Sequence, residues 1–158
     1  MLARFSFLAL ALTLQLSSAQ SPLESWSPNP LPSPPADGAN PGFTWFRAYV
    51  NVPANWQGSR LLLVAGNIDT VDEAFFNGDK IGANGSMPPL FSKPASDIRR
   101  PFVIEPDQVN FGADNLIAWR VYSKDKPASV RNGPIHLSRK DDAIDLAGTW
   151  LKKSGDKP

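Results

Sequence analysis

The chain has 158 residues, no cysteine and a nearly balanced charge, with 16 Lys plus Arg against 15 Asp plus Glu. Arg4 is the only charged residue among the first 19, so the remainder is formally neutral. A protein that binds nucleic acid would show a cationic stripe, and the pairs Arg99–Arg100 and Lys152–Lys153 are too small and scattered to form one. The missing cysteine excludes a lipoprotein anchor, a thiol nucleophile and a thiolate metal site.

The first 19 residues predict a secretory signal peptide. Arg4 supplies a positive charge, residues 5–16 form a short apolar run, and Ser17, Ser18 and Ala19 offer small residues for cleavage. The apolar run is shorter than the roughly 20 residues of a transmembrane helix, and no later stretch approaches that length. We therefore expect a secreted or periplasmic protein without a membrane span.

Residues 20–41 hold seven prolines among Ser, Asn, Asp and Gly, a composition that favours extended conformations over a packed core. This predicts a linker or arm, in which Trp26 either packs against the following domain or stays in solvent. Residues 42–152 predict one domain, because a chain of about 140 residues buries enough surface to fold without disulfides. Residues 153–158 are left as a C-terminal tail.

Alternating side chains predict a strand in "TWFRAYVNV", residues 44–52. One face holds Phe46, Ala48, Val50 and Val52, and the other holds Trp45, Arg47, Tyr49 and Asn51. Pro53 ends the strand. The apolar run "RLLLVAG", residues 60–66, predicts a central strand that is covered on both faces.

The remaining segments predict more short strands. In "EAFFNGDKIG", residues 73–82, Asn77 and Gly78 can form the two-residue turn of a hairpin. A short strand is expected in "RRPFVIEP", residues 99–106, and alternation recurs in "NLIAWRVY", residues 115–122. No helical periodicity is sustained and no internal repeat is present, so the pattern predicts an all-β fold, an antiparallel β-sandwich.

The acidic residues near the hairpin do not match a known calcium-binding loop. Asp69, Asp72 and Glu73 lack the alternating oxygen ligands and the closing glutamate of an EF-hand loop. A looser calcium site between loops, using Asp69, Asp72 or the Asp141–Asp142 pair, is an open alternative. The frequency of Asp in turns favours solvated turn residues instead, so we expect no cofactor.

The sequence contains no recognisable set of catalytic residues. A glycosidase needs two carboxyl groups across a sugar cleft, and the glutamates are Glu24 in the proline-rich segment and Glu73 and Glu105 near strand ends, where solvated positions are expected. His136, the only histidine, lies between two apolar residues in "GPIHLS", so its side chain should point away from theirs. No Gly-x-Ser-x-Gly elbow accompanies it. The chain is therefore not expected to be an enzyme.

Three segments together resemble a known domain type. They are "GFTWFRAYVNVPANWQGSRLLLVAGNIDTVDEAFFNGDKIG", "FVIEPDQVNFGADNLIAWRVY" and "GPIHLS". In this order they resemble the galactose-binding-like jelly-roll domain of family 2 glycoside hydrolases (β-galactosidases, β-glucuronidases) and of sialate O-acetylesterases. The closing "IDLAGTWLKK" is similar to the segment after this domain in acetylesterase-like members. The resemblance covers about Gly42 to Lys152 and implies a jelly roll in which the Asn77–Gly78 hairpin is structural and Gly82 marks a position where a side chain would interfere.

The resemblance also implies a function. In those enzymes the catalytic residues lie in a neighbouring module, so the jelly roll is expected to be an exported, non-catalytic module that binds a glycan or glycoside. The loop after Tyr122 is often glycine-rich in relatives but reads "SKDKPASVRNG" here. The expected sugar-binding residues are Lys124, Asp125, Arg131 and Asn132 in this loop, with Trp45 or Trp56 as stacking platforms.

Two alternatives stay open from the sequence. The sandwich can be a structural or protein-interaction domain of the cell envelope, tethered by its proline-rich arm. It can also belong to a truncated hydrolase whose catalytic module is encoded separately, which would make a hydrolase module its partner.

Overall fold

The computed structural model describes residues 26–33, 41–68, 70–93 and 100–158. The predicted signal peptide, residues 1–19, lies outside the described residues, as do Glu24, Asp69 and Arg99. Within the described ranges, no helix is long and apolar enough to cross a membrane.

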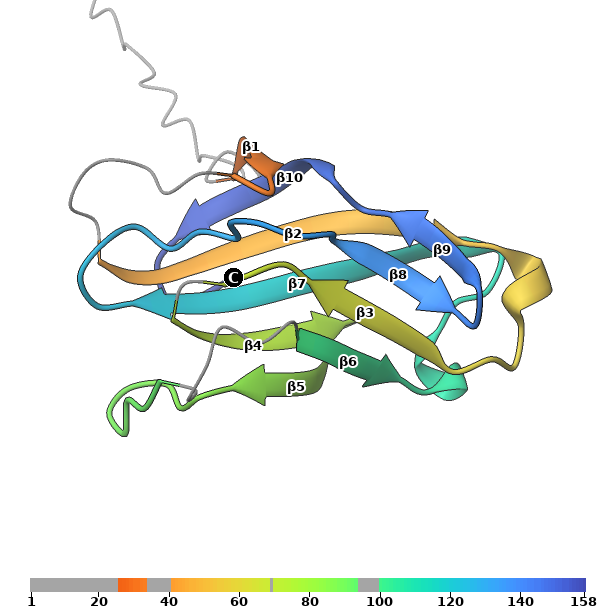
Figure 1. The fold of residues 1–158 in the computed structure, drawn as a ribbon, viewed down its shortest axis with the longest axis horizontal. Helices are drawn as coiled ribbons and strands as arrows, with labels where there is room; N and C mark the ends of the chain where they lie inside the picture. Colours follow the sequence, from red (N-terminus) through yellow and green to blue (C-terminus); the bar gives the residue numbers. More distant parts are fainter. Residues whose placement is uncertain (1–25, 34–40, 69, 94–99) are drawn as a thin grey trace, which may run out of the picture.

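Two antiparallel sheets pack face to face, which confirms the predicted β-sandwich (Figure 1). One sheet has six strands in the order β1-β10-β2-β7-β4-β5, and the other has four in the order β6-β3-β8-β9. The strands are β1 Ser27–Leu31, β2 Gly42–Val52, β3 Leu61–Ala65, β4 Val71–Phe76, β5 Asp79–Asn84, β6 Arg100–Ile104, β7 Ala113–Ser123, β8 His136–Arg139, β9 Asp142–Asp145 and β10 Gly148–Ser154. Two short 3-10 turns, η2 Ala54–Trp56 and η3 Pro106–Gln108, follow β2 and β6.

The core lies between the sheets and follows the predicted alternation. β2 contributes Phe46 and Val50 from one face, and β7 contributes Ile117, Trp119 and Val121, all of them buried. They meet the buried side chains of the four-stranded sheet, which are Leu61, Leu63, Ala65, Phe102, Ile104 and Leu137. Trp119 also stacks on Trp150 of β10, with 4.7 Å between ring centroids. The period-two pattern of two long strands therefore positions most of the core.

The prediction that β3 is covered on both faces is wrong for one of the two faces. Leu61 and Leu63 are fully buried, but Leu62 is 41% exposed and lies opposite Val103, which is 44% exposed. β3 is central in its sheet, yet Leu62 and Val103 are exposed on the outer face of that sheet. An antiparallel sheet can leave one face in solvent, which the apolar run alone does not reveal.

Part of the proline-rich segment belongs to the sheet rather than to a linker. Ser27–Leu31 form β1, which pairs with β10, and Leu31 is buried in the core. Trp26 packs under the guanidinium of Arg47, whose carbon lies 4.0 Å from the ring centroid. β1 is an edge strand, where proline is tolerated because one side of the strand needs no N–H donors.

The Asn77–Gly78 hairpin forms as predicted between β4 and β5. Both turn residues have positive φ, 51° for Asn77 and 93° for Gly78, as the common two-residue turn requires. At Gly82 in β5, a Cβ atom would lie 2.5 Å from Cδ1 of Phe102 in β6. The missing side chain lets this ring approach β5, which confirms the predicted interference.

Candidate functional site on the outer face of the six-stranded sheet

A row of charged and aromatic residues crosses the outer face of the six-stranded sheet. The strand register places Trp45 of β2 opposite Arg120 of β7, and Arg120 opposite Glu73 of β4. On the other side of Trp45, the register places Lys153 of β10. Because side chains on opposite positions of neighbouring strands touch, the alternation itself sets an arginine between an aromatic ring and a carboxylate.

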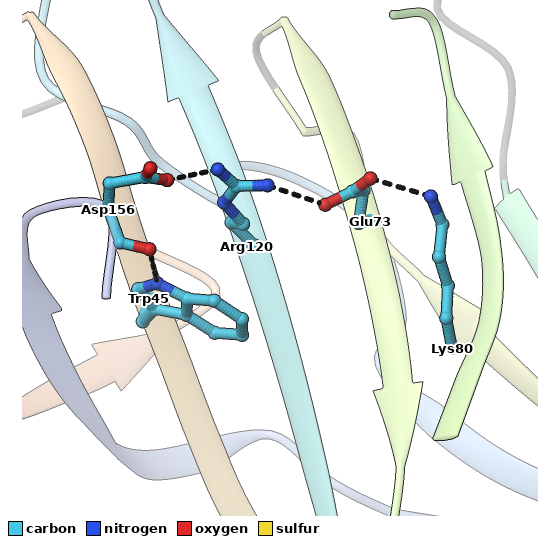
Figure 2. A network of polar contacts seen from close by, with 5 residues as sticks. All are labelled: Trp45, Glu73, Lys80, Arg120 and Asp156. Carbon is cyan, nitrogen blue, oxygen red and sulfur yellow. Dashed lines mark hydrogen bonds and ion pairs between the residues drawn. The ribbon is translucent and has the colours of Figure 1, made fainter. Parts of the chain in front are cut away.

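These residues form a continuous polar network (Figure 2). Glu73 accepts from Lys80 Nζ through Oε1 at 2.6 Å and from Arg120 Nη1 through Oε2 at 3.0 Å. Arg120 Nη2 also pairs with the carboxylate of Asp156. Trp45 Nε1 donates to the backbone oxygen of Asp156 at 3.0 Å. The network therefore links four strands to the segment that follows β10.

The segment after β10 lies against the sheet. Besides the contacts of Asp156, Gly155 N donates to Phe43 O at 2.9 Å, and Lys153 Nζ donates to Pro158 O at 3.1 Å. Residues 153–158 were predicted to be a tail, whereas β10 runs to Ser154 and the following residues cover part of the outer face. Their hydrogen bonds depend on strands far away in sequence, which composition does not show.

Glu73 is held in its ionised form. Burial tends to raise the pKa of this carboxyl, but hydrogen bonds from Lys80 and Arg120, together with their charges, outweigh burial and lower the pKa below its ordinary value. Burial likewise disfavours the charged form of Arg120, and its bonds to Asp156 and Glu73 raise its pKa. Both oxygens of Glu73 are occupied by cations, so this carboxylate suits a structural ion pair and not a proton donor.

Three aromatic rings gather beside this network. Phe43 lies 5.0 Å and Phe91 lies 5.5 Å from the ring centroid of Tyr122, and the Arg120 guanidinium carbon lies 4.4 Å from the centroid of Phe43. All three rings are half-buried. We call Phe43, Phe91 and Tyr122 the end cluster, because Phe43 lies near the start of β2 and Tyr122 near the end of β7.

Phe91 reaches the end cluster from the loop between β5 and β6. Reciprocal backbone hydrogen bonds between Ser86 and Ser92, at 2.9 and 3.2 Å, close this loop upon itself. The neighbouring Leu90 is strongly exposed. The loop therefore presents apolar surface beside the Tyr122 ring, in a part of the molecule that solvent reaches.

The loop residues that were predicted to bind sugar lie in two separate places. Lys124 and Asp125 are exposed and directly follow β7, so they adjoin Tyr122 in the chain. Arg131 is half-buried and Asn132 is exposed, and they lie at the other end of the loop. There, Arg131 N donates to Asn67 O and Asn67 N donates to Asn132 O, both at 2.8 Å. Their backbones thus join the loop to the β3–β4 connection.

The two predicted tryptophans are buried. Trp45 is 7% exposed, packs 5.4 Å from the ring of Phe75 and is covered by Asp156. Trp56 is 4% exposed and lies beside Arg139, whose guanidinium carbon is 5.5 Å from its ring centroid. A stacking platform needs a free ring face, so this burial does not support the prediction that either ring stacks on a sugar.

Two of the acidic residues considered as calcium ligands are held by hydrogen bonds or ion pairs. Among the residues that the structure describes, no group of three or more His, Cys, Asp or Glu is arranged to hold a metal ion. Asp72 is buried in β4 and accepts from Asn84 Nδ2 at 3.2 Å, and Asp142 pairs with Arg139 at 2.9 Å. The prediction that Asp72 is a solvated turn residue and Glu73 a solvated edge residue is wrong, because β4 carries both into packed surroundings.

His136 lies as alternation predicts. The flanking Ile135 and Leu137 are fully buried, whereas His136 is half-buried and faces away from the core. Its strand neighbours across the sheet are Val64 and Asp145.

The end cluster was missed in the sequence. Tyr122 lies on the outward face of a well-predicted strand, and this alternation was the one indication in the sequence that its ring is accessible. Phe91 carried no signal, because it lies in a loop whose path depends on how β5 and β6 are placed. Phe43 precedes the segment with clear alternation, and only its register with Tyr122 brings it into the cluster.

No protein-family model matches the sequence, and no curated protein matches it either. Solved structures resemble the chain over part of their length. A family 2 glycosyl hydrolase from Bacteroides cellulosilyticus is 21% identical with a TM-score of 0.44, and the match covers 70% of this chain and 12% of that one. The β-glucuronidase of Ruminococcus gnavus is 13% identical with a TM-score of 0.43, covering 71% of this chain and 20% of that one. The chain spans only 12% and 20% of the length of these two glycosidases.

Proposed function

We propose that the chain is an exported, non-catalytic carbohydrate-binding module that holds a glycan or glycoside at the end cluster. The observation that carries this proposal is the grouping of three half-buried rings with Tyr122 leading directly into the exposed Lys124 and Asp125. Sugar sites combine aromatic surface, which contacts the C–H face of a ring, with a few polar groups that bind hydroxyls. The end cluster and the start of the following loop provide both.

Binding without catalysis is the better fit to the acidic residues. Hydrolysis of a glycoside needs one carboxyl group with a raised pKa to act as acid and a second carboxylate beside it. Glu73 reaches the rings through Arg120, which also pairs with Asp156, but the pKa of Glu73 is lowered and both its oxygens accept hydrogen bonds from cations. This arrangement supports a structural role for the network beneath the rings.

A glycan array tests the proposal. The purified secreted protein should bind at least one glycan class, and Tyr122→Ala should reduce that binding about tenfold, which corresponds to about 1.4 kcal/mol. Leu62→Ala is the matched control, because it removes an exposed apolar side chain from the opposite sheet. The same protein should not release product from glycosides or acetyl esters. Absence of binding to every glycan, or unaided turnover, would contradict the proposal.

A second candidate function is docking to a separate hydrolase module or another envelope protein. It is favoured by the exposed apolar pair Leu62 and Val103 on the outer face of the four-stranded sheet. Under this alternative, Leu62→Lys should weaken capture of a partner from the source extract and leave glycan binding unchanged. A catalytic module encoded beside this reading frame would identify the partner to test.

Export is proposed from the leader sequence. Secretion followed by N-terminal sequencing of the mature protein should place the cleavage site after Ala19. An N-terminus that retains residues 1–19 would contradict export by this route.

A further inference from the structure

We infer that a groove beside Tyr49, at the edge of β2 where β10 separates from it, is a second sugar subsite that takes a neutral hexose. This inference rests on the proposed carbohydrate-binding function and extends it to residues far from the end cluster. Tyr49 is 64% exposed, and among the described residues it is the only aromatic one that is so exposed. It lies six positions after Phe43 on β2, roughly 20 Å along the strand at 3.3 Å per residue.

The groove arises where two strands separate. β10 pairs with β2 from Ser154 to Leu151, and the register ends at Leu151 opposite Arg47. Beyond that point β2 continues beside β7, while residues 148–150 of β10 pair with β1. The separation leaves a groove of about 430 Å³ between residues 48–51 of β2 and residues 144–150.

The wall opposite Tyr49 is fixed by hydrogen bonds. Leu146 N donates to Ile135 O at 2.8 Å, and Ala147 N donates to Asp145 Oδ1 at 2.9 Å. Trp150 Nε1 donates to Leu146 O, also at 2.8 Å. A wall that is already ordered loses little conformational entropy when a ligand binds, which favours even a small ligand.

The lining has the composition of a sugar site. The residues that line the groove include Tyr49, Thr149, Asn51 and Asp145, which carry an aromatic ring, a hydroxyl, an amide and a carboxylate. Asn51 Nδ2 donates to Asp114 Oδ1 at 3.1 Å, which holds the amide in place. Asp145 is the only charged residue among those that line the groove. A single carboxylate accepts hydrogen bonds from sugar hydroxyls and repels a uronate, so the groove favours a neutral sugar over an anionic one.

Amide chemical-shift mapping of the full secreted chain tests this subsite. The probes are methyl β-galactoside and methyl β-glucoside as neutral sugars and methyl β-glucuronide as the anionic one. In the wild type, a neutral probe should shift the amides of residues 145–149. Tyr49→Ala should remove these shifts or weaken the affinity at least about tenfold, and it should leave shifts near residues 122–125 unchanged. Because Tyr49 is exposed, this variant should fold, and Leu62→Ala controls for loss of an exposed apolar side chain.

The outcomes separate the two proposals. Shifts near 122–125 without shifts at 145–149 would overturn the Tyr49 subsite and leave the proposed function intact. Shifts at 145–149 without any near 122–125 would support the subsite and contradict the end cluster as the binding site. No shift with any probe would overturn both. A larger response at 145–149 to the glucuronide than to the neutral sugars would overturn the assigned ligand class.

Discussion

Arg120 lies directly opposite Glu73 on the neighbouring strand, and its Nη1 donates to Glu73 Oε2 at 3.0 Å. Their side chains are only 22% and 15% exposed, so solvent screens this pair less than an ordinary surface pair. Arg120 also packs over Phe43 of the end cluster. The ion pair therefore supports the rings proposed to bind sugar.

Replacing Glu73 should destabilise the protein. Glu73→Gln removes the anion from between Lys80 and Arg120, and we expect a loss of about 1 to 3 kcal/mol in the free energy of unfolding, measured by urea denaturation. The control is Glu105→Gln, because Glu105 pairs with Arg60 at 3.0 Å in an exposed position, where a loss below about 1 kcal/mol is expected. Equal losses in both variants would contradict a special role for the Glu73 network.

The same pair should make stability depend on acid pH. The pKa of Glu73 is lowered from its ordinary value of 4.5, so its contribution is fully present above that value and is lost as the pH falls through the lowered pKa. Thermal unfolding of wild type and Glu73→Gln should therefore differ most near neutral pH, and the gap should narrow below about pH 4.5. A difference in thermal stability between the two proteins that stays constant or widens on acidification would contradict a lowered pKa of Glu73.

Asn77 should matter through its side chain as well as its backbone. Its amide accepts from Leu116 N at 2.9 Å and donates to Gln108 O at 2.9 Å and to Asn115 Oδ1 at 2.8 Å. Asn77→Ala should cost about 2 to 4 kcal/mol, because it loses these bonds and places Ala at a positive φ. Asn77→Gly keeps the backbone freedom and should cost about 1 kcal/mol less. Equal costs for the two variants would mean that the turn geometry contributes nothing.

Gly82 should tolerate no side chain. Gly82→Ala would place Cβ against the buried ring of Phe102, and we expect about 1 to 3 kcal/mol of destabilisation in urea unfolding. Ala83→Ser, at the next and exposed position, should change stability by less than about 0.5 kcal/mol. If Phe102→Leu relieves part of the cost in the double variant, the contact itself is the cause. A neutral Gly82→Ala would contradict the close approach of β5 and β6.

The long strands were predictable because their signal is local. In β2 and β7 the apolar residues alternate over many positions, and a single core fixes which face is buried. β1 was not predicted, because its prolines indicate a linker. Only its pairing with β10, which is distant in the sequence, makes this segment a strand. Trp45 was correctly placed on the outer face, but the covering Asp156 is a contact between distant parts of the chain. The end cluster and the Tyr49 groove likewise depend on strand register and on where strands diverge, which no short pattern encodes.

Calorimetric titration of the wild type and Tyr122→Ala with the strongest glycan found on the array tests the central claim most directly. We expect saturable binding by the wild type and about tenfold weaker binding by Tyr122→Ala, with unfolding curves that show the variant to be folded. Equal affinities for the two folded proteins, or no heat of binding with any glycan, would contradict a sugar site at the end cluster.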